Sequence, residues 1–428
     1  MLHYPRSRKL DFSTCLLVSL LLAACSQDEP AQEMAMDTAT PAPESNAIVY
    51  EGARLIIGDG SAPIENALFI VEDGIFQLVG STAAVTVPAN ASRVDLSGMT
   101  VMPMILDTHT HLNIEREALL EDLQTRVRYG VSAAMSLGRD FGDAPFQIQQ
   151  EIIPGTARYL TAGRGITAPE PGRSEDPHWV TSPEEARAAV REEAALGVDI
   201  IKIWVDDRDG QVDKLAPELY EAVIDEAHQL GLRVTAHIYN LSDAKSLLEA
   251  GIDAFAHGVR DIPVDEEFIQ MIQARPHVVV VPNLNERGVI TDLSWLQGTM
   301  PDADWQALQA RQSEDPQAQA AYAIQAVNLA ALNEAGVTIA LGTDGNTPWA
   351  PHLEMEDMVI AGMSPLQVIT AATTNAANFL GLDNMGSIMP GKSADFIVLS
   401  ANPLDDITNS RRIVDVYLRG ERIDRSNQ

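Results

Sequence analysis

Two histidines separated by one residue stand at the end of an apolar segment. The segment from Met102 to Leu112 reads MPMILDTHTHL and contains His109 and His111. Because side chains alternate between the two faces of a strand, positions two apart point the same way. Two imidazoles held side by side suit a divalent metal ion, although a polar strand end with two ordinary histidines has the same pattern.

A lysine inside a second apolar segment is the next unusual residue. The segment VDIIKIWVDD places Lys202 among residues typical of a buried strand. A free ammonium is costly to bury. The side chain therefore either reaches solvent or pairs with Asp206 or Asp207, or it carries a carbamate, an anion that can bridge two metal ions.

Three further candidate ligands stand at the ends of apolar segments. His237 lies in RVTAHIYN, His257 in AFAHGVRD and Asp344 in ALGTDGN. Each of them alone is an unremarkable polar residue. Together with the two histidines and the lysine described above, they predict a metal centre if the fold brings these segment ends together.

The pattern of the chain between residues 104 and 384 predicts such a fold. Apolar runs alternate with amphipathic helical stretches, which is typical of βα units around a parallel sheet. The expected strands are Ile105–His109, Val131–Leu137, Ala157–Ala162, Ile200–Trp204, Arg233–His237, Ala254–His257, His277–Pro282 and Val337–Gly342. Eight strands in about 240 residues match a TIM barrel, whose active site lies at the C-terminal ends of the strands.

The flanking segments predict a second, smaller domain. Residues 47–103 contain short β-type runs broken by glycines, and residues 385–428 return to strand patterns. We therefore expect an α/β fold in which a (β/α)8 TIM barrel, residues 104–384, is inserted in a small β-sandwich domain composed of both flanking segments.

The start of the chain predicts export and a lipid anchor. The apolar run Leu16–Ala24 follows three basic residues, as in a signal peptide. The sequence ending at Cys25 resembles a bacterial lipobox; a plain signal peptide is the alternative. We expect a lipoprotein signal peptide over residues 1–24, a lipidated Cys25 and a flexible linker over residues 25–46. Ser26 after the cysteine favours the outer membrane, on its periplasmic side.

Charge and cysteine usage exclude several function classes. The chain has 29 Lys+Arg and 61 Asp+Glu residues, a net charge of -32. This excess argues against nucleic acid or an anionic membrane surface as a partner, so the lipid anchor is the only expected membrane contact. Because both cysteines, Cys15 and Cys25, lie in the N-terminal segment, the mature fold is expected to have no disulfide and no thiol nucleophile.

These motifs resemble those of the amidohydrolase superfamily, in particular its imidazolonepropionase-like and prolidase-like members. MPMILDTHTHL is similar to the family's PGLIDxHxHL, with Met104 where the family usually has glycine. ATTNAANFLGLDNMGSIMPGKSADFIVL is similar to its closing segment, and the resemblance covers about Ile48 to Asp424. It implies a metal-dependent hydrolase that acts on a small-molecule substrate, and it allows a homo-oligomer.

The resemblance also assigns roles to the candidate ligands. It implies two divalent metal ions, usually zinc, although Mn, Co or Fe suit similar ligands. The implied ligands are His109, His111 and Asp344 for the more buried ion and His237 and His257 for the more exposed one, with a carbamate on Lys202 between them. Asp344 would also be catalytic, passing a proton from water to the leaving amine.

Four residues are candidates for substrate binding. Tyr239 resembles a tyrosine that contacts the substrate carboxylate in prolidase-like relatives, and His352 resembles a position of their HxELE pattern. Arg260 or Arg164 could pair with a carboxylate, although Arg260 could equally pair with Asp261. We expect a peptide-like amide substrate, either a dipeptide or an N-acyl amino acid. A cyclic amidase such as imidazolonepropionase, a lactonase and a lipid-anchored non-catalytic binding protein are the alternatives.

Overall fold

The structure is a computed structural model that describes residues 46–425 except 83–86, 88–90, 173–174 and 285–286. The signal peptide, Cys25 and all but the last residue of the linker lie outside the described residues. The lipid anchor and the periplasmic location therefore stay predictions. Among the described helices, none is both long and apolar enough to span a bilayer.

All eight barrel strands expected from the sequence are present. They are β6 (Ile105–Thr110), β7 (Val131–Ser136), β8 (Arg158–Thr161), β11 (Ile201–Val205), β12 (Val234–Ile238), β13 (Ala254–Phe255), β14 (Val279–Val280) and β15 (Thr338–Ile339). Neighbours pair in parallel from β6 to β8 and from β11 to β15. Short strands β9 (Ile166–Thr167) and β10 (His178–Trp179) extend the sheet beside β11.

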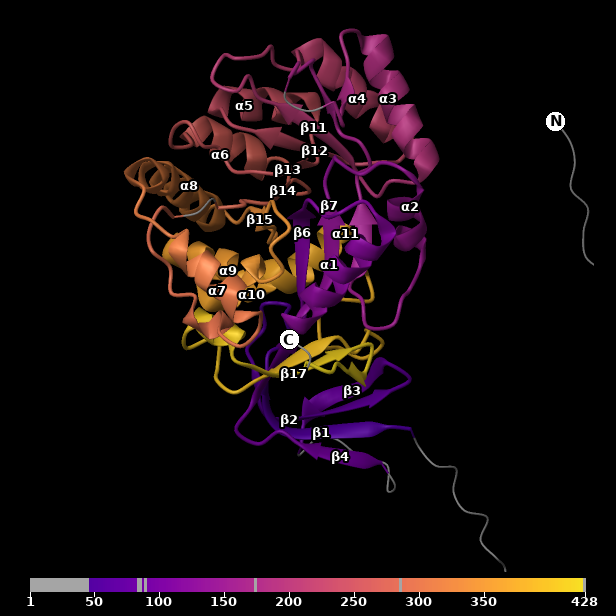
Figure 1. The fold of residues 1–428 in the computed structure, drawn as a ribbon, viewed down its shortest axis with the longest axis vertical. Coiled ribbons are helices and arrows are strands. Elements are labelled where there is room, and N and C mark those ends of the chain that lie inside the picture. Colours follow the sequence, from indigo (N-terminus) through magenta and orange to yellow (C-terminus); the bar gives the residue numbers. More distant parts are fainter. Residues whose placement is uncertain (1–45, 83–86, 88–90, 173–174, 285–286, 426–428) are drawn as a thin grey trace, which may run out of the picture. The chain divides into compact units, whose positions relative to one another are not determined.

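Two contacts join the separate ladders into a barrel. The Asp199 N–H donates to the Thr161 carbonyl at 2.9 Å, between the end of β8 and the start of β11. Thr110 of β6 pairs in parallel with Gly345, which follows β15. The predicted α/β TIM barrel is therefore confirmed (Figure 1).

Helices follow the strands as the alternating pattern predicts (Figure 1). The first group is α1 (Arg116–Arg128), α2 (Asp143–Gln150), α3 (Pro183–Leu196), α4 (Pro217–Gln229), α5 (Leu241–Ala250) and α6 (Glu266–Gln273). The second is α7 (Asp302–Ala310), α8 (Pro316–Glu334), α9 (Ala350–Ile360), α10 (Pro365–Thr370) and α11 (Ala376–Leu380). Helix α3 shows why the sequence sets these boundaries. The Ser182 hydroxyl caps its first turn, Pro183 occupies the first helical position, and Gly197 ends it with φ 85°.

Strands from both ends of the described chain form one further sheet. Its members are β1 (Ile48–Leu55), β2 (Ile64–Glu72), β3 (Ile75–Ser81), β4 (Ser92–Asp95), β5 (Thr100–Pro103), β16 (Phe396–Leu399), β17 (Ile413–Leu418) and β18 (Glu421–Arg422). Their order is β18-β17-β16-β5-β1-β2-β3, with β4 paired to β1. Strand β5 therefore lies between an N-terminal and a C-terminal strand, and β6 begins two residues after it.

An aromatic cluster holds the two ends of the chain together in this sheet. Tyr50 stacks on Phe69 at 4.9 Å between ring centroids, and Phe396 stacks on Tyr417 at 4.4 Å. The Phe69 ring also meets Phe396 edge to face at 5.3 Å. Aromatic pairs in these arrangements add to the free energy of burial. The cluster therefore fixes the N-terminal strands against the C-terminal ones.

Replacement of Phe69 by alanine should destabilise the sheet that contains the aromatic cluster without changing any residue at the rim of the barrel. Phe69 is fully buried, so Phe69→Ala is expected to lower the free energy of unfolding by about 3–5 kcal/mol. Val414→Ala, at an exposed position of β17, is the control and should change it by less than about 0.5 kcal/mol. Chemical denaturation measures both variants, and equal losses would contradict a packing role for the cluster.

Candidate metal centre

The end of β6 and the chain after β15 are bonded together at the barrel's C-terminal rim. The N–H groups of Thr343 and Asp344 both donate to the His109 carbonyl, at 3.0 and 2.8 Å. The His111 N–H donates to the Gly345 carbonyl at 3.2 Å. Asp344 has φ 56°, a left-handed conformation that is uncommon outside glycine and often found at functional sites. These bonds place its carboxylate beside both imidazoles.

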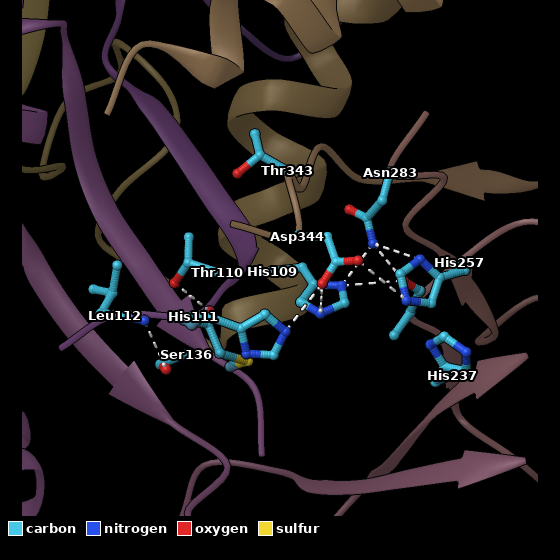
Figure 2. Close-up of polar contacts among 12 residues, drawn as sticks. His109, Thr110, His111, Leu112, Ser136, His237, His257, Asn283, Thr343 and Asp344 are labelled. Atoms are coloured by element: carbon cyan, nitrogen blue, oxygen red, sulfur yellow. Dashed lines mark hydrogen bonds and ion pairs between the residues drawn. The ribbon is translucent and has the colours of Figure 1, made fainter. Parts of the chain in front are cut away.

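The first group of candidate ligands converges on one oxygen of Asp344 (Figure 2). Its Oδ1 lies 3.1 Å from His109 Nε2 and 3.0 Å from His111 Nε2. The three residues can each offer a ligand atom within 4.8 Å of the others. Burial alone would raise the pKa of Asp344, but the neighbouring imidazoles hold it well below its usual range. The carboxyl is therefore ionised, as a metal ligand must be.

His109 is oriented by a contact at its other nitrogen. Its Nδ1 lies 3.0 Å from the Ala256 carbonyl, so this nitrogen can donate and leave the lone pair of Nε2 free for a metal ion. Burial lowers the pKa of His109 to about 4, which keeps the ring neutral at pH 7. A neutral imidazole is the form that binds metal ions.

His237 and His257 lie on the other side of Asp344 from His111 (Figure 2). Their ring centroids are 4.4 Å apart, and His257 Nε2 lies 3.6 Å from Asp344 Oδ2. Burial lowers the pKa of His237 to about 4 and that of His257 well below its usual value. The two oxygens of Asp344 thus face two different groups of imidazoles.

Lys202 is buried in β11 and does not form the ion pairs considered from the sequence. Asp206 contacts Arg208 and His237, and Asp207 lies 3.6 Å from Lys214. Nζ of Lys202 has no hydrogen-bond partner among the described residues. Burial lowers the pKa of this amine to about 7, which gives it a large neutral fraction. A neutral amine is the form that reacts with carbon dioxide to give a carbamate.

The residues at this rim fit a metal centre. Buried polar atoms that make no hydrogen bond of good geometry are rare in folded proteins. In the described part of the chain, both His109 Nε2 and Lys202 Nζ are such atoms. Four imidazoles, an ionised carboxylate and a reactive amine are a donor set that suits zinc and similar divalent ions. The structure brings together all six residues that the sequence suggested as ligands.

Two of the predicted substrate residues lie at this centre. Arg260 Nη2 is 2.6 Å from His257 Nδ1, and its backbone N–H donates to the Tyr239 carbonyl at 2.8 Å. The Tyr239 side chain is partly exposed beside it. Asp261, the alternative partner of Arg260, instead accepts from the Leu241 N–H at 3.0 Å.

The other two predicted substrate residues are engaged elsewhere. Arg164 donates from Nε to the Asp176 carbonyl at 2.5 Å and from Nη2 to the Pro177 carbonyl at 3.4 Å. The structure contradicts the substrate-binding role expected for His352. This side chain is buried, with Nδ1 at 3.0 Å from Ser410 Oγ and Nε2 at 2.9 Å from the Tyr129 carbonyl. Both nitrogens are occupied, so neither can reach a substrate.

Residues not predicted from the sequence also reach the centre. Asn283, after β14, has φ 44° and places Nδ2 2.6 Å from His109 Nδ1 (Figure 2). Arg208, after β11, has φ 54° and places Nη1 3.1 Å from His237 Nε2. Both follow a barrel strand at its C-terminal end, which is the one signal that could have identified them.

A cavity of about 610 Å³ opens beside the centre, and we call it the Asp344 cavity. Thr343 and Asp344 form one wall, and the segment after β14 and residues of α9 form others. Cavities of this size hold small-molecule ligands. The arrangement therefore combines a candidate metal centre with an adjoining space for a substrate.

Comparisons with known proteins place this fold among hydrolases. The sequence pattern of the amidohydrolase family matches residues 100–423. Ochratoxinase from Aspergillus niger is 27% identical over 421 residues, which cover 84% of this chain and 82% of that enzyme. Imidazolonepropionase from Streptomyces coelicolor is 25% identical over 390 residues, covering 83% and 93%. The structure of a putative prolidase from Bifidobacterium longum aligns with TM-score 0.74 and 28% identity over 89% of this chain and 95% of that one.

Metal analysis of the purified protein tests whether this centre binds two ions. In bicarbonate buffer without chelator, we expect about two divalent ions per chain. Lys202→Ala should lower this content clearly if a carbamate on this amine joins the two sets of ligands. Lys214→Ala, whose Nζ pairs with Asp243 at 2.7 Å, is the control and should keep both ions. One ion per chain, unchanged in Lys202→Ala, would leave the lysine with a structural role only.

Proposed function

This chain belongs to the amidohydrolase family, and we propose that it is a binuclear metal-dependent hydrolase that cleaves a peptide-like amide bond. We propose as its substrate a small molecule with a free carboxylate, either a dipeptide or an N-acyl amino acid. The observation that carries the proposal is the position of Asp344, whose two oxygens face the imidazole of His111 on one side and that of His257 on the other. A carboxylate between two sets of ligands can both bind metal and move a proton.

The relatives support amide hydrolysis but differ in substrate. The name of the solved putative prolidase agrees with a dipeptide substrate, whereas imidazolonepropionase agrees with the cyclic-amide alternative. Arg260 lies directly beside His257, where its guanidinium can bind the carboxylate of a dipeptide or of an N-acyl amino acid, and we propose the open-chain substrate on this ground together with the prolidase-like relative. A non-catalytic binding protein would be expected to have lost ligands, and all six candidates are present here.

In the proposed reaction, the ligands hold the metal ions and Asp344 transfers the proton. Divalent ions held by these ligands would polarise the scissile carbonyl and lower the pKa of the attacking water. Asp344 accepts the proton of this water and delivers it to the leaving amine nitrogen. The bonds from the Thr343 and Asp344 N–H groups to the His109 carbonyl keep the carboxylate in position for both transfers.

Arg260 and Tyr239 anchor the substrate in this proposal. A guanidinium matches the geometry of a carboxylate with two parallel hydrogen bonds. Burial lowers the pKa of Arg260, and a bound carboxylate would further stabilise its charged form. Tyr239, with its exposed ring next to Arg260, offers a hydroxyl to the same group.

Asp344→Asn should separate catalysis from metal binding. The amide keeps an oxygen that can face the metal but cannot accept the proton, so kcat is expected to fall by a factor of about 10²–10⁴ while much of the metal stays bound. A panel of dipeptides and N-acyl amino acids, assayed by release of the free amine, measures turnover. Asp383→Asn, at an exposed position, is the control and should match the wild type. Near-normal turnover by Asp344→Asn would rule out this proton transfer.

A further inference from the structure

Glu354 is a buried carboxyl in the wall of the Asp344 cavity. It belongs to α9 and is 4% exposed. Its Oε1 accepts the Leu284 N–H at 3.0 Å. Glu354 makes no other hydrogen bond with a described residue, so Oε2 is available to a molecule in the cavity.

The surroundings of Glu354 disfavour its ionised form unless a cation lies next to it. Burial raises the pKa of Glu354 well above its ordinary value, and the nearby Asp357 and Asp107 raise it further. Arg287, a cation of the same cavity, is already paired with Asp357 at 2.7 Å and Glu356 at 3.1 Å. Burial therefore favours the protonated form of Glu354 when the cavity is empty, in spite of the charge of Arg260, and a cation bound beside Glu354 favours loss of this proton and an ion pair.

The same cavity has an apolar wall. Leu293, Leu308, Trp349 and Leu353 all line it, and they belong to one cluster in which α7 packs near α9 (Figure 1). Trp349 is held there by an edge contact with Tyr129, with the ring centroids 5.7 Å apart. The cavity therefore joins a buried acid to a surface that suits an apolar side chain.

We propose that Glu354 binds the free α-ammonium group of the substrate, and that the enzyme is a dipeptidase preferring an apolar first residue. This inference rests on the proposed amide hydrolysis and decides between its two substrate classes, since an N-acyl amino acid has no ammonium group. The α-carbon that bears the ammonium is bonded directly to the scissile carbonyl carbon. A carboxylate that binds this ammonium must therefore lie close to the metal centre.

The placement of Glu354 meets this requirement. It shares the cavity with Thr343 and Asp344. The charge of Arg260 acts on Glu354 and that of Glu354 on Arg260, and Arg260 contacts the candidate ligand His257. A dipeptide thus meets Arg260 with its carboxylate and Glu354 with its ammonium, while its first side chain enters the apolar part of the cavity. The exposed Arg311 also lines the cavity, but solvent and salt screen its charge.

Two substrates that differ only in the ammonium group test the proposal. Leucyl-L-alanine has this group, and 4-methylpentanoyl-L-alanine lacks it. Wild-type enzyme should hydrolyse the first with a kcat/KM about 10- to 100-fold higher, the range of a charge-assisted hydrogen bond. Glu354→Gln, which keeps an oxygen for the Leu284 N–H, should remove most of this preference and leave the second substrate within about three-fold of wild type.

Matched measurements separate recognition from folding. Glu334→Gln, at the exposed end of α8, is the control and should retain the wild-type preference. Metal content and thermal unfolding temperature should be the same in wild type and Glu354→Gln. The proposal is overturned if wild type does not prefer leucylalanine, or if Glu354→Gln lowers hydrolysis of both substrates equally.

A binding experiment distinguishes failure of this inference from failure of the proposed function. If wild type hydrolyses neither substrate, the proposed amide hydrolysis is in error, and the affinities of L-leucinamide and 4-methylpentanamide decide about Glu354. Calorimetry with the metal-loaded enzyme should find tighter binding of L-leucinamide to wild type, lost in Glu354→Gln. Equal affinity of wild type for the two amides would overturn the assignment.

Discussion

The structure depends on the hydrogen-bonded seam between β6 and the chain that follows β15. One carbonyl, that of His109, accepts from the N–H groups of both Thr343 and Asp344. The buried side chain of Asp107 adds two further hydrogen bonds to this seam. Its carboxyl accepts from the Thr343 hydroxyl at 2.7 Å and from the Thr343 N–H at 3.1 Å. The bonds that close the barrel are therefore also the bonds that bring the Asp344 carboxylate to the imidazoles, so one constraint serves both fold and site.

The smaller sheet fixes the start of β6, the first strand of this seam. Strand β5 leads into β6 after one residue, and β5 pairs with β16 from the C-terminal part of the chain. The stacked rings of Tyr50, Phe69, Phe396 and Tyr417 hold this pairing in place. The first barrel strand thus starts from an anchored position, which fixes how far His109 and His111 project at its other end.

The sequence predicted the barrel and the residues that gather at its rim because both depend on local pattern. Apolar runs locate the strands, and a polar side chain just after such a run lies at the rim. Strands β13 and β14 are only two residues long in the structure, yet His257 and Asn283 still reach the centre, because the chain continues in the strand direction. Helices and loops were harder to predict. Successive positions of a helix differ by about 100°, so His352 turns toward Tyr129 while Glu354 faces the cavity. Arg208 reaches His237 through a left-handed backbone that no pattern in its neighbourhood indicates.

The contact between His111 and Asp344 joins residues 233 positions apart in the chain. Such a contact forms only after residue 344 of the 428 has left the ribosome, because the chain after the last barrel strand must be available to meet the first strand. A growing chain therefore displays its histidines without the carboxylate that completes their site. A metal ion that needs both the imidazoles and this carboxylate would therefore bind only after the last barrel strand is made, and its binding would stabilise the closed barrel.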